Sequence, residues 1–210
     1  MNTNRLSKTV IERLPLYLGY LKSEGAAAAE HISSTTIAKA LRLGEVQVRK
    51  DLALISGAGR PKTGYVKANL IERLEEYLHF KAENTAVLVG AGKLGRALLD
   101  YDGFAEYGLQ ISAGFDSDGR KTGTAEGGRP IYPLSAFTDF CRENHPRIGI
   151  LTVPETSAQG ICDLMTENGI LAVWDFSGAR LTVPDGVLVR QENMASSLAV
   201  LSEHLNQVSY

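Results

Sequence analysis

Apolar residues recur at helical spacing through roughly the first 80 residues of the chain. The pattern predicts helices over residues 7–22, 37–41, 46–55 and 69–80. Pro15 falls inside the first of these, and because proline lacks a backbone N–H we expect it to kink or divide that helix. Hydroxyl residues at 33–36 precede the second helix and are suited to cap its first turn.

The second and third of these helices are short and are joined by a tight turn that contains Gly44. Two short helices across a glycine-containing turn are typical of a helix-turn-helix. The segment that follows, residues 57–64, combines glycines and a proline with Arg60 and Lys62. The sequence therefore predicts a winged helix-turn-helix with a polar β-hairpin tip as its wing.

From residue 85 onward short apolar runs alternate with helical patterns. Strands are predicted at 86–89, 111–115, 148–153 and 171–176, with a further candidate at 187–189, and helices at 94–101, 134–143 and 156–167. Continuous apolar strands that alternate with helices indicate a parallel sheet covered on both faces. A last helix over 194–208 carries Leu198, Leu201, Leu205 and Val208 along one stripe. We therefore divide the α/β chain into residues 1–82, 83–190 and 191–210.

Composition narrows the class of protein. The chain has 210 residues, of which 44% are hydrophobic, enough for a real core. No apolar run approaches the roughly 20 residues of a membrane span, and the N-terminus has no apolar signal core, so we expect a cytoplasmic protein. Cys141 and Cys162 lack metal-ligand spacing and four histidines are scattered, so neither a disulfide nor a metal site is expected.

The net charge of -2 is a cancellation between two unlike parts. Residues 1–82 hold 13 Lys and Arg against 8 Asp and Glu, a charge of +5. Residues 83–210 hold 9 against 16, a charge of -7. A basic first part favours a polyanion as its partner, whereas the acidic second part favours a different ligand.

The strand at 86–89 leads into a glycine-rich turn, Gly90-Ala91-Gly92-Lys93-Leu94-Gly95, and then into a helix. G-x-G-x-x-G in this context is typical of dinucleotide binding, since its glycines permit a tight turn, close approach of a pyrophosphate and close helix packing. Asp116 follows the next predicted strand, where a carboxylate can bind ribose hydroxyls and repel a 2′-phosphate. NAD is thus favoured over NADP, although Arg120 and Lys121 lie nearby and weaken the preference.

The second predicted site is the third helix, where Gln47 and Lys50 share a face and Arg49 flanks it. Arginine can read guanine, glutamine can read adenine, and lysine can anchor phosphates. Arg60 and Lys62 on the wing are placed to reach a phosphate or the minor groove. A solvated basic helix face is the alternative, but helix pair, basic helix and basic wing together favour DNA.

No catalytic constellation stands out, so the dinucleotide site is interpreted as a sensor and the chain as a non-enzyme. Tyr101, Tyr107 and Tyr132 have no lysine four residues on, and neither a nucleophile elbow nor a P-loop is present. Two alternatives stay open. One is a small NAD-dependent oxidoreductase with a helical appendage, and the other is a Rossmann module that binds coenzyme A.

With these residues in hand, the chain resembles the Rex family of redox-sensing transcriptional repressors. The likeness runs from about Arg13 to Leu205 and rests on a set of short motifs. They are Arg13-Leu-Pro-Leu-Tyr17, Val48-Arg-Lys-Asp-Leu52, Val89-Gly-Ala-Gly-Lys-Leu-Gly-Arg96, Tyr101-Asp-Gly-Phe104, Phe115-Asp116, Ile150-Leu-Thr-Val-Pro154 and Val183-Pro184. The resemblance implies an N-terminal winged helix, a Rossmann domain for NADH and NAD, and a homodimer with exchanged C-terminal helices.

By the same resemblance, such a repressor binds a palindromic operator in double-stranded DNA when NADH is scarce and releases it when NADH rises. Gln47, Arg49 and Lys50 would face the major groove, with Arg60 and Lys62 on the wing. The implied dinucleotide site comprises Gly90, Ala91, Gly92, Lys93, Leu94, Gly95, Asp116, Thr152, Val153 and Pro154. Tyr101 would sit at the dimer contact that changes with the ligand, opposite position 193 of the other subunit.

This chain departs from the family pattern at four positions. Gly19 stands where the family often has arginine, Pro61 enters the wing, and Gly178 alters a loop after the 171–176 strand. Asn193 replaces an aspartate that would pair with the tyrosine of the other subunit. We therefore expect the NADH switch to be weakened or to run through other contacts.

Overall fold

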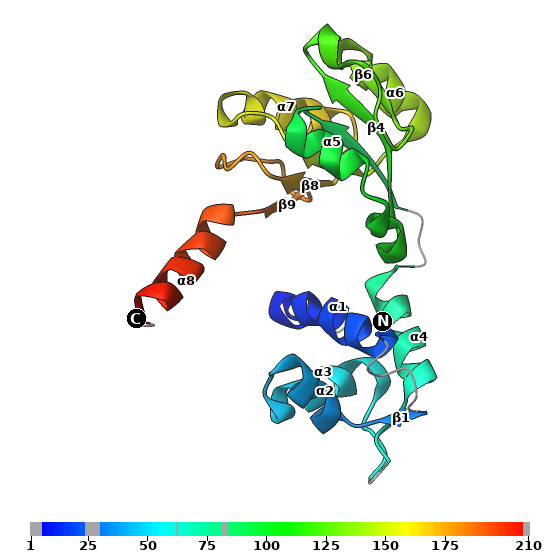
Figure 1. Ribbon diagram of the computed structural model, residues 1–210. Helices are drawn as coiled ribbons and strands as arrows, with labels where there is room; N and C mark the ends of the chain where they lie inside the picture. The colour runs from blue at the N-terminus through cyan, green and yellow to red at the C-terminus, as the bar shows by residue number, and fades with distance from the viewer. Residues whose placement is uncertain (1–5, 24–29, 62, 81–83, 208–210) are drawn as a thin grey trace. The chain divides into compact units, whose positions relative to one another are not determined.

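The computed structural model describes residues 6–23, 30–61, 63–80 and 84–207. The chain forms two compact units, residues 1–82 and 83–210 (Figure 1). Each unit has its own apolar core, and each is described by itself below.

The described residues of the first unit form four helices and a two-stranded sheet. The helices are α1 (Lys8–Lys22), α2 (Ser34–Leu41), α3 (Glu45–Ser56) and α4 (Lys67–Leu78), and the antiparallel strands are β1 (His31–Ile32) and β2 (Tyr65–Val66). Ser7 and Ser33 cap α1 and α2 through their hydroxyl oxygens, which accept backbone N–H groups from Val10 and Thr36. The expected division of α1 is wrong, because Pro15 lies inside one continuous helix.

The core of this unit explains why the helices assemble. Leu14, Tyr17, Ile37, Leu52 and Leu74 come from four different helices and are fully buried. The wing is tied at its base by an antiparallel bridge between Arg60 and Gly64, as a hairpin tip requires. The apolar pattern placed Val46 in the core, but this residue is 55% exposed.

The second unit contains a seven-stranded sheet in the order β5-β6-β4-β3-β7-β8-β9. Its strands are β3 (Asn84–Val89), β4 (Leu109–Asp116), β5 (Gly123–Thr124), β6 (Pro130–Pro133), β7 (Ile148–Leu151), β8 (Ala172–Asp175) and β9 (Leu188–Gln191). All neighbouring pairs are parallel except β5 and β6. The chain leaves β3 first toward β4 and later toward β7, so a topological switch point lies where these strands end.

Both faces of this sheet are covered. On one face α6 (Phe137–Asn144) and α7 (Glu155–Glu167) contribute Phe137, Cys141, Cys162 and Met165 to a core with the strands. On the other face α5 (Lys93–Leu99) and the 3₁₀ turn η2 (Asp102–Tyr107) cover a second core around Leu99. The predicted parallel sheet with helices on both faces is thus confirmed.

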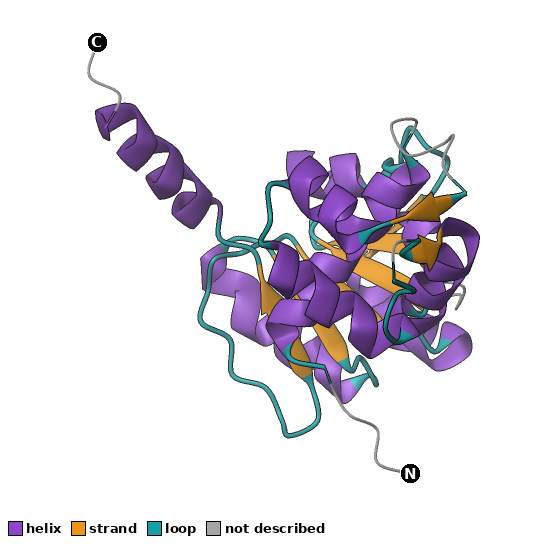
Figure 2. Cartoon of the chain, turned by 90° about the horizontal axis from the view of Figure 1, so that it is seen from below, coloured by secondary structure: helices purple, strands orange, loops and turns teal. Residues whose placement is uncertain are grey.

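The chain continues from β9 into α8 (Met194–Gln207), the purple rod that leads to the C-terminus in Figure 2. Every residue of α8 is exposed within this chain. Met194, Leu198, Leu201 and Leu205, each more than 60% exposed, form one apolar stripe along it. Val208, the last predicted member of the stripe, lies outside the described residues. No helix among the described residues is long and apolar enough to cross a membrane.

Candidate functional site

The glycine-rich turn after β3 is held by contacts that leave no room for side chains. Gly90 has a φ of +108°, and a Cβ there would lie 2.6 Å from the carbonyl oxygen of Thr152. A Cβ on Gly95 would overlap the carbonyl oxygen of Gly90. The hydroxyl of Thr152 lies 2.8 Å from that carbonyl oxygen and donates to it. The turn is thereby locked to the end of β7, whereas Gly92 faces open space, where a ligand can approach the backbone.

Asp116, the last residue of β4, points its carboxylate at this turn. The residue is buried, with 5% of its surface exposed. Oδ2 accepts the backbone N–H of Ala91 at 2.8 Å, and Oδ1 accepts that of Asp118 at 2.8 Å. Nζ of Lys121 donates to the same carboxylate at 3.1 Å from Oδ2. Nζ also lies 3.3 Å from Oδ1, so these donors occupy the roughly four acceptor positions of the carboxylate. Lys121 is 41% exposed and can turn aside, which frees one position on each oxygen for a hydroxyl.

The second cation near Asp116 is paired with a different acid. Arg120 donates from Nε and Nη2 to the two oxygens of Asp118, at 3.0 and 2.9 Å. The side-chain and backbone hydrogen bonds from Arg120 lower the pKa of Asp118 to about 2, so this acid is ionised at neutral pH. Of the two cations that weakened the expected preference for NAD, only Lys121 therefore lies on the Asp116 carboxylate.

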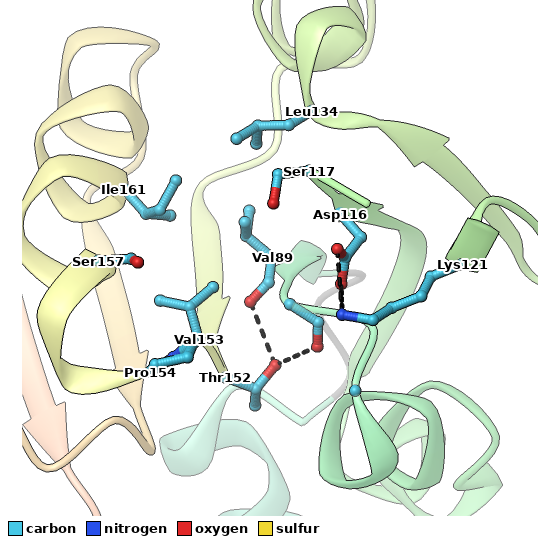
Figure 3. A pocket seen from close by; sticks show the side chains of 12 residues that line it. Val89, Asp116, Ser117, Lys121, Leu134, Thr152, Val153, Pro154, Ser157 and Ile161 are labelled. Atoms are coloured by element: carbon cyan, nitrogen blue, oxygen red, sulfur yellow. Dashed lines mark hydrogen bonds and ion pairs between the residues drawn. The ribbon is translucent and has the colours of Figure 1, made fainter. Parts of the chain in front are cut away.

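These groups border a cavity of about 480 Å³, a volume in the range of small-molecule sites (Figure 3). Asp116 and Lys121 lie on one side of it, and Thr152, Val153 and Pro154 on the other. Six predicted residues line it: Gly90, Gly92, Asp116, Thr152, Val153 and Pro154. The cavity thus has charged groups at one edge and apolar groups such as Val153, Pro154 and Ile161 at the other.

Four predicted residues do not line the cavity. Ala91 and Gly95 are buried behind it, where they fix the turn, and Lys93 and Leu94 are exposed on the first turn of α5. Six lining residues were not assigned to the site from the sequence, although Lys121 was placed near Asp116: Val89, Ser117, Lys121, Leu134, Ser157 and Ile161. Ser157 and Ile161 are four residues apart on α7, a spacing that places both on one helix face, but no motif marked that face.

In the first unit the predicted DNA-contacting side chains are exposed on α3 and the wing. Gln47, Arg49 and Lys50 are exposed on α3, as is Arg60 at the base of the wing, while Lys62 lies outside the described residues. Arg49 and Arg60 border one hollow of about 250 Å³ together with Ser33, Ser34 and Tyr65. Two arginines beside the capped start of α2 make this hollow suited to a phosphate group. Ser33 and Ser34 had been interpreted only as helix caps.

A buried ion pair fixes α3 against α1. Arg13 donates to the two oxygens of Asp51, from Nε at 2.8 Å and from Nη2 at 3.0 Å. The hydroxyl of Tyr17 donates to Oδ2 of Asp51 at 2.7 Å. Asp51 is 3% exposed and Tyr17 is fully buried. Because removal of one partner leaves an unpaired buried charge, this cluster strongly constrains where α3 lies relative to α1.

Burial, reinforced by the hydrogen bond to Asp51, raises the pKa of Tyr17 from 10 to about 12. Folding thus favours the protonated phenol, and the unfolded chain loses this proton first as the pH rises. We expect the free energy of unfolding to fall between about pH 10 and pH 12, a loss that Tyr17→Phe should remove. Circular dichroism against denaturant at several pH values measures this, with Tyr77→Phe, a tyrosine of α4, as the control.

The predicted switch residues and cysteines are not part of either site. Tyr101 is 54% exposed and rests edge-on against Phe104, with ring centroids 4.9 Å apart. Asn193 caps α8, since its Oδ1 accepts the backbone N–H of Ser196 at 3.0 Å. Cys141 and Cys162 are free, and burial raises the pKa of Cys141 to about 11, so it stays a thiol. Among the described residues no cluster of His, Cys, Asp and Glu is suited to a metal ion.

A helix-turn-helix unit joined to a Rossmann unit with a cavity beside its glycine-rich turn defines the class of ligand-responsive DNA-binding regulators. The chain is 41% identical to a redox-sensing transcriptional repressor Rex of Treponema denticola, with 93% of each chain covered. It is 37% identical to the Rex repressor of Porphyromonas gingivalis, over 97% of this chain and 94% of that one. The chain therefore belongs to the Rex family of redox-sensing transcriptional repressors.

Solved structures agree with this assignment. A Rex-family repressor, RSP, in complex with β-NAD⁺ and operator DNA superposes with a TM-score of 0.89 at 30% identity, covering 98% of this chain and 94% of that chain. The RSP complex with β-NADH gives a TM-score of 0.87, also at 30% identity, with 98% and 96% covered. The predicted fold class and the resemblance to Rex are confirmed.

Two family models match separate parts of the chain. A putative DNA-binding protein N-terminus matches residues 5–53, and a CoA binding domain matches residues 81–179. The description of the second model names coenzyme A, whereas the solved structures of RSP contain β-NAD⁺ and β-NADH. Because the relatives are repressors over nearly the whole chain, the prediction of a non-enzyme is confirmed and the oxidoreductase alternative is wrong.

Proposed function

We propose that this protein binds operator DNA through its first unit and NAD or NADH through its second, and that NADH releases it from the operator. The observation that carries the proposal is the buried Asp116 carboxylate at the edge of the 480 Å³ cavity, beside a turn that only glycine can form. RSP, a relative at 30% identity, has been solved with β-NAD⁺ and operator DNA and with β-NADH.

In the second unit Asp116 binds the ribose hydroxyls next to adenine. Gly90 and Gly92 leave the backbone open to the pyrophosphate, and Thr152, Val153 and Pro154 border the nicotinamide half. The Asp116 carboxylate beside the ribose repels a 2′-phosphate, which favours NAD(H) over NADP(H). The nucleotide is a regulatory ligand here, and no step of chemistry follows its binding.

In the first unit α3 is the recognition helix. Gln47, Arg49 and Lys50 face the major groove, and Arg60 and Lys62 reach the backbone or minor groove from the wing. The net charge of +5 over residues 1–82 supports this partner. A protein that binds chromosomal operators acts in the cytoplasm of a bacterium, and we place it there.

The functional form is a homodimer that α8 joins through its apolar stripe. Two recognition helices then meet two half-sites of a palindrome, about one helical turn apart. NADH can release DNA only if it binds the arrangement that is incompetent for DNA more tightly than the competent one. Movement of the Rossmann units relative to one another, passed on by the exchanged α8 helices, changes the spacing of the recognition helices.

An operator-binding assay tests this proposal. The probe is a palindromic duplex enriched by the protein from a random-sequence library, and NADH or NAD is titrated into a gel-shift reaction. We expect saturating NADH to weaken operator binding about 10- to 100-fold and NAD to leave it nearly unchanged. Unchanged binding at saturating NADH would contradict the sensor proposal.

Arg49→Ala gives the matched variant for this assay. Loss of a groove-facing arginine is expected to cost roughly 10- to 100-fold in operator affinity. Calorimetric titration with NADH should give the wild-type affinity, because Arg49 belongs to the other unit. If Arg49→Ala binds the operator normally, Arg49 does not face the DNA.

A further inference from the structure

The terminal amide of Gln47 lies against Arg13, which contacts one of its two terminal atoms. One of its two terminal atoms lies 2.9 Å from Nε and 3.0 Å from Nη1 of Arg13. A guanidinium has only donors, so the atom that faces it is the carbonyl oxygen Oε1. The –NH₂ group, with two donor hydrogens, then points away from Arg13.

Arg13 can hold this amide because its own position is fixed. Nε and Nη2 are bound to Asp51, which leaves Nη1 for Gln47. Arg13 is on α1, and Gln47 and Asp51, four residues apart, are on one face of α3. The side chain of Arg13 is only 20% exposed, so water competes weakly for its donors.

This orientation restricts what Gln47 can recognise. Glutamine reads adenine bidentately by accepting from the 6-amino group and donating to N7, which requires both halves of its amide. With Oε1 turned toward Arg13, the –NH₂ donors are the half of the amide that points away from Arg13. Donors match the acceptor edges of guanine, at O6 and N7, and of thymine, at O4.

We propose that Arg13 is a specificity-determining residue, which orients Gln47 so that it reads an acceptor-only base edge in the major groove instead of adenine bidentately. The inference rests on the proposed function, because it needs α3 in the groove of operator DNA. Arg13 acts through Gln47 as a positioning residue, so its signature is a change in base preference and not merely a loss of affinity.

The test begins with selection of duplexes from a random-sequence library by the full-length wild type and by Gln47→Ala. The base pair whose preference disappears in Gln47→Ala is the one that Gln47 reads. We expect the wild type to prefer guanine or thymine there. At a guanine, 7-deazaguanine, which lacks the N7 acceptor, should lower affinity roughly 5- to 10-fold.

Arg13→Lys is the central variant, since lysine keeps a charge for Asp51 but has no planar fork to hold Gln47 as well. We expect its preference at that base pair to shift toward adenine, and replacement of that adenine by purine, which lacks the 6-amino group, should then lower its affinity. Arg73→Lys, an arginine of α4 paired with Glu76, is the control and should keep the wild-type preference. Gln47→Glu removes the –NH₂ donors while Arg13 stays in place, so it tests whether those donors set the base preference.

The outcomes separate the inference from the proposed function. No enriched sequence from the wild type would overturn both. An enriched operator with the same preference in wild type, Gln47→Ala and Arg13→Lys would overturn the inference alone. So would a wild-type preference for adenine that depends on its 6-amino group, or a Gln47→Glu variant with unchanged preference.

Discussion

Introduction of two charges into the apolar stripe of α8 is expected to convert the protein into monomers and to lower operator affinity at least 100-fold. The variant is the double substitution Leu198→Glu and Leu205→Glu. The two leucines are 64% and 63% exposed within the chain and lie on one face of α8 with Met194 and Leu201. Four large apolar side chains at this spacing have no partner among the described residues of their own chain.

The expected loss follows from burial at the dimer contact. Each large apolar side chain that becomes buried contributes about 1.5–3 kcal/mol, so four from each subunit account for a stable contact. Two glutamates on the stripe would place charge in an apolar interface. A monomer has one recognition helix, and loss of the second site removes an effective-concentration advantage of about 100-fold or more.

Sedimentation velocity and gel shift on the enriched palindrome measure the two effects. The matched control is Ser196→Glu with Asn206→Glu, which adds the same charge to α8 away from the stripe. We expect this control to remain dimeric and to bind the operator. If the leucine variant is still a dimer with normal operator affinity, α8 does not form the contact.

Much of the architecture follows from local patterns, and the exceptions have physical causes. Apolar periodicity predicted the four helices of the first unit and the main strands of the second. The short strands β5 and β6 were not predicted, because Gly123–Thr124 and Pro130–Pro133 have too few residues and too much glycine and proline to show a strand pattern. Val46 is apolar yet exposed, because at 3.6 residues per turn it lies on the side of α3 away from the buried Val48 and Leu52.

Site residues could be predicted from the sequence where they lie close together in one motif. The glycine turn and Asp116 stood out because a motif with fixed spacing defines them. The Arg13–Asp51–Tyr17 cluster did not, because its partners are 34 and 38 residues apart in the chain and meet only when α1 packs on α3. The contact between Arg13 and Gln47 could not be predicted either, because it also forms only when α1 packs on α3. It changes the interpretation of Gln47, which the sequence analysis had matched to adenine.

Asp116→Ala is expected to lower NADH affinity about 100-fold and to leave operator binding without nucleotide unchanged. The carboxylate is 5% exposed and faces the cavity. A hydrogen bond to a charged group contributes about 1.5–3 kcal/mol, so loss of the bonds to two ribose hydroxyls accounts for the effect. Calorimetric titration of the full-length protein measures NADH affinity, and gel shift measures operator affinity.

The same variant should also change the choice between nucleotides. In the wild type Lys121 is bound to Asp116, at 3.1 Å from Oδ2. Without the carboxylate this lysine is released beside the ribose, where it can attract a 2′-phosphate. We therefore expect NADPH affinity to fall less than NADH affinity, or to rise, which reduces the preference for NADH.

The control is Asp139→Ala, which removes an exposed acid paired with Arg142 on α6 and should change neither NADH affinity nor NADPH affinity. Equal losses for both nucleotides would show that Lys121 does not take part in the discrimination, and unchanged NADH affinity would remove Asp116 from the site.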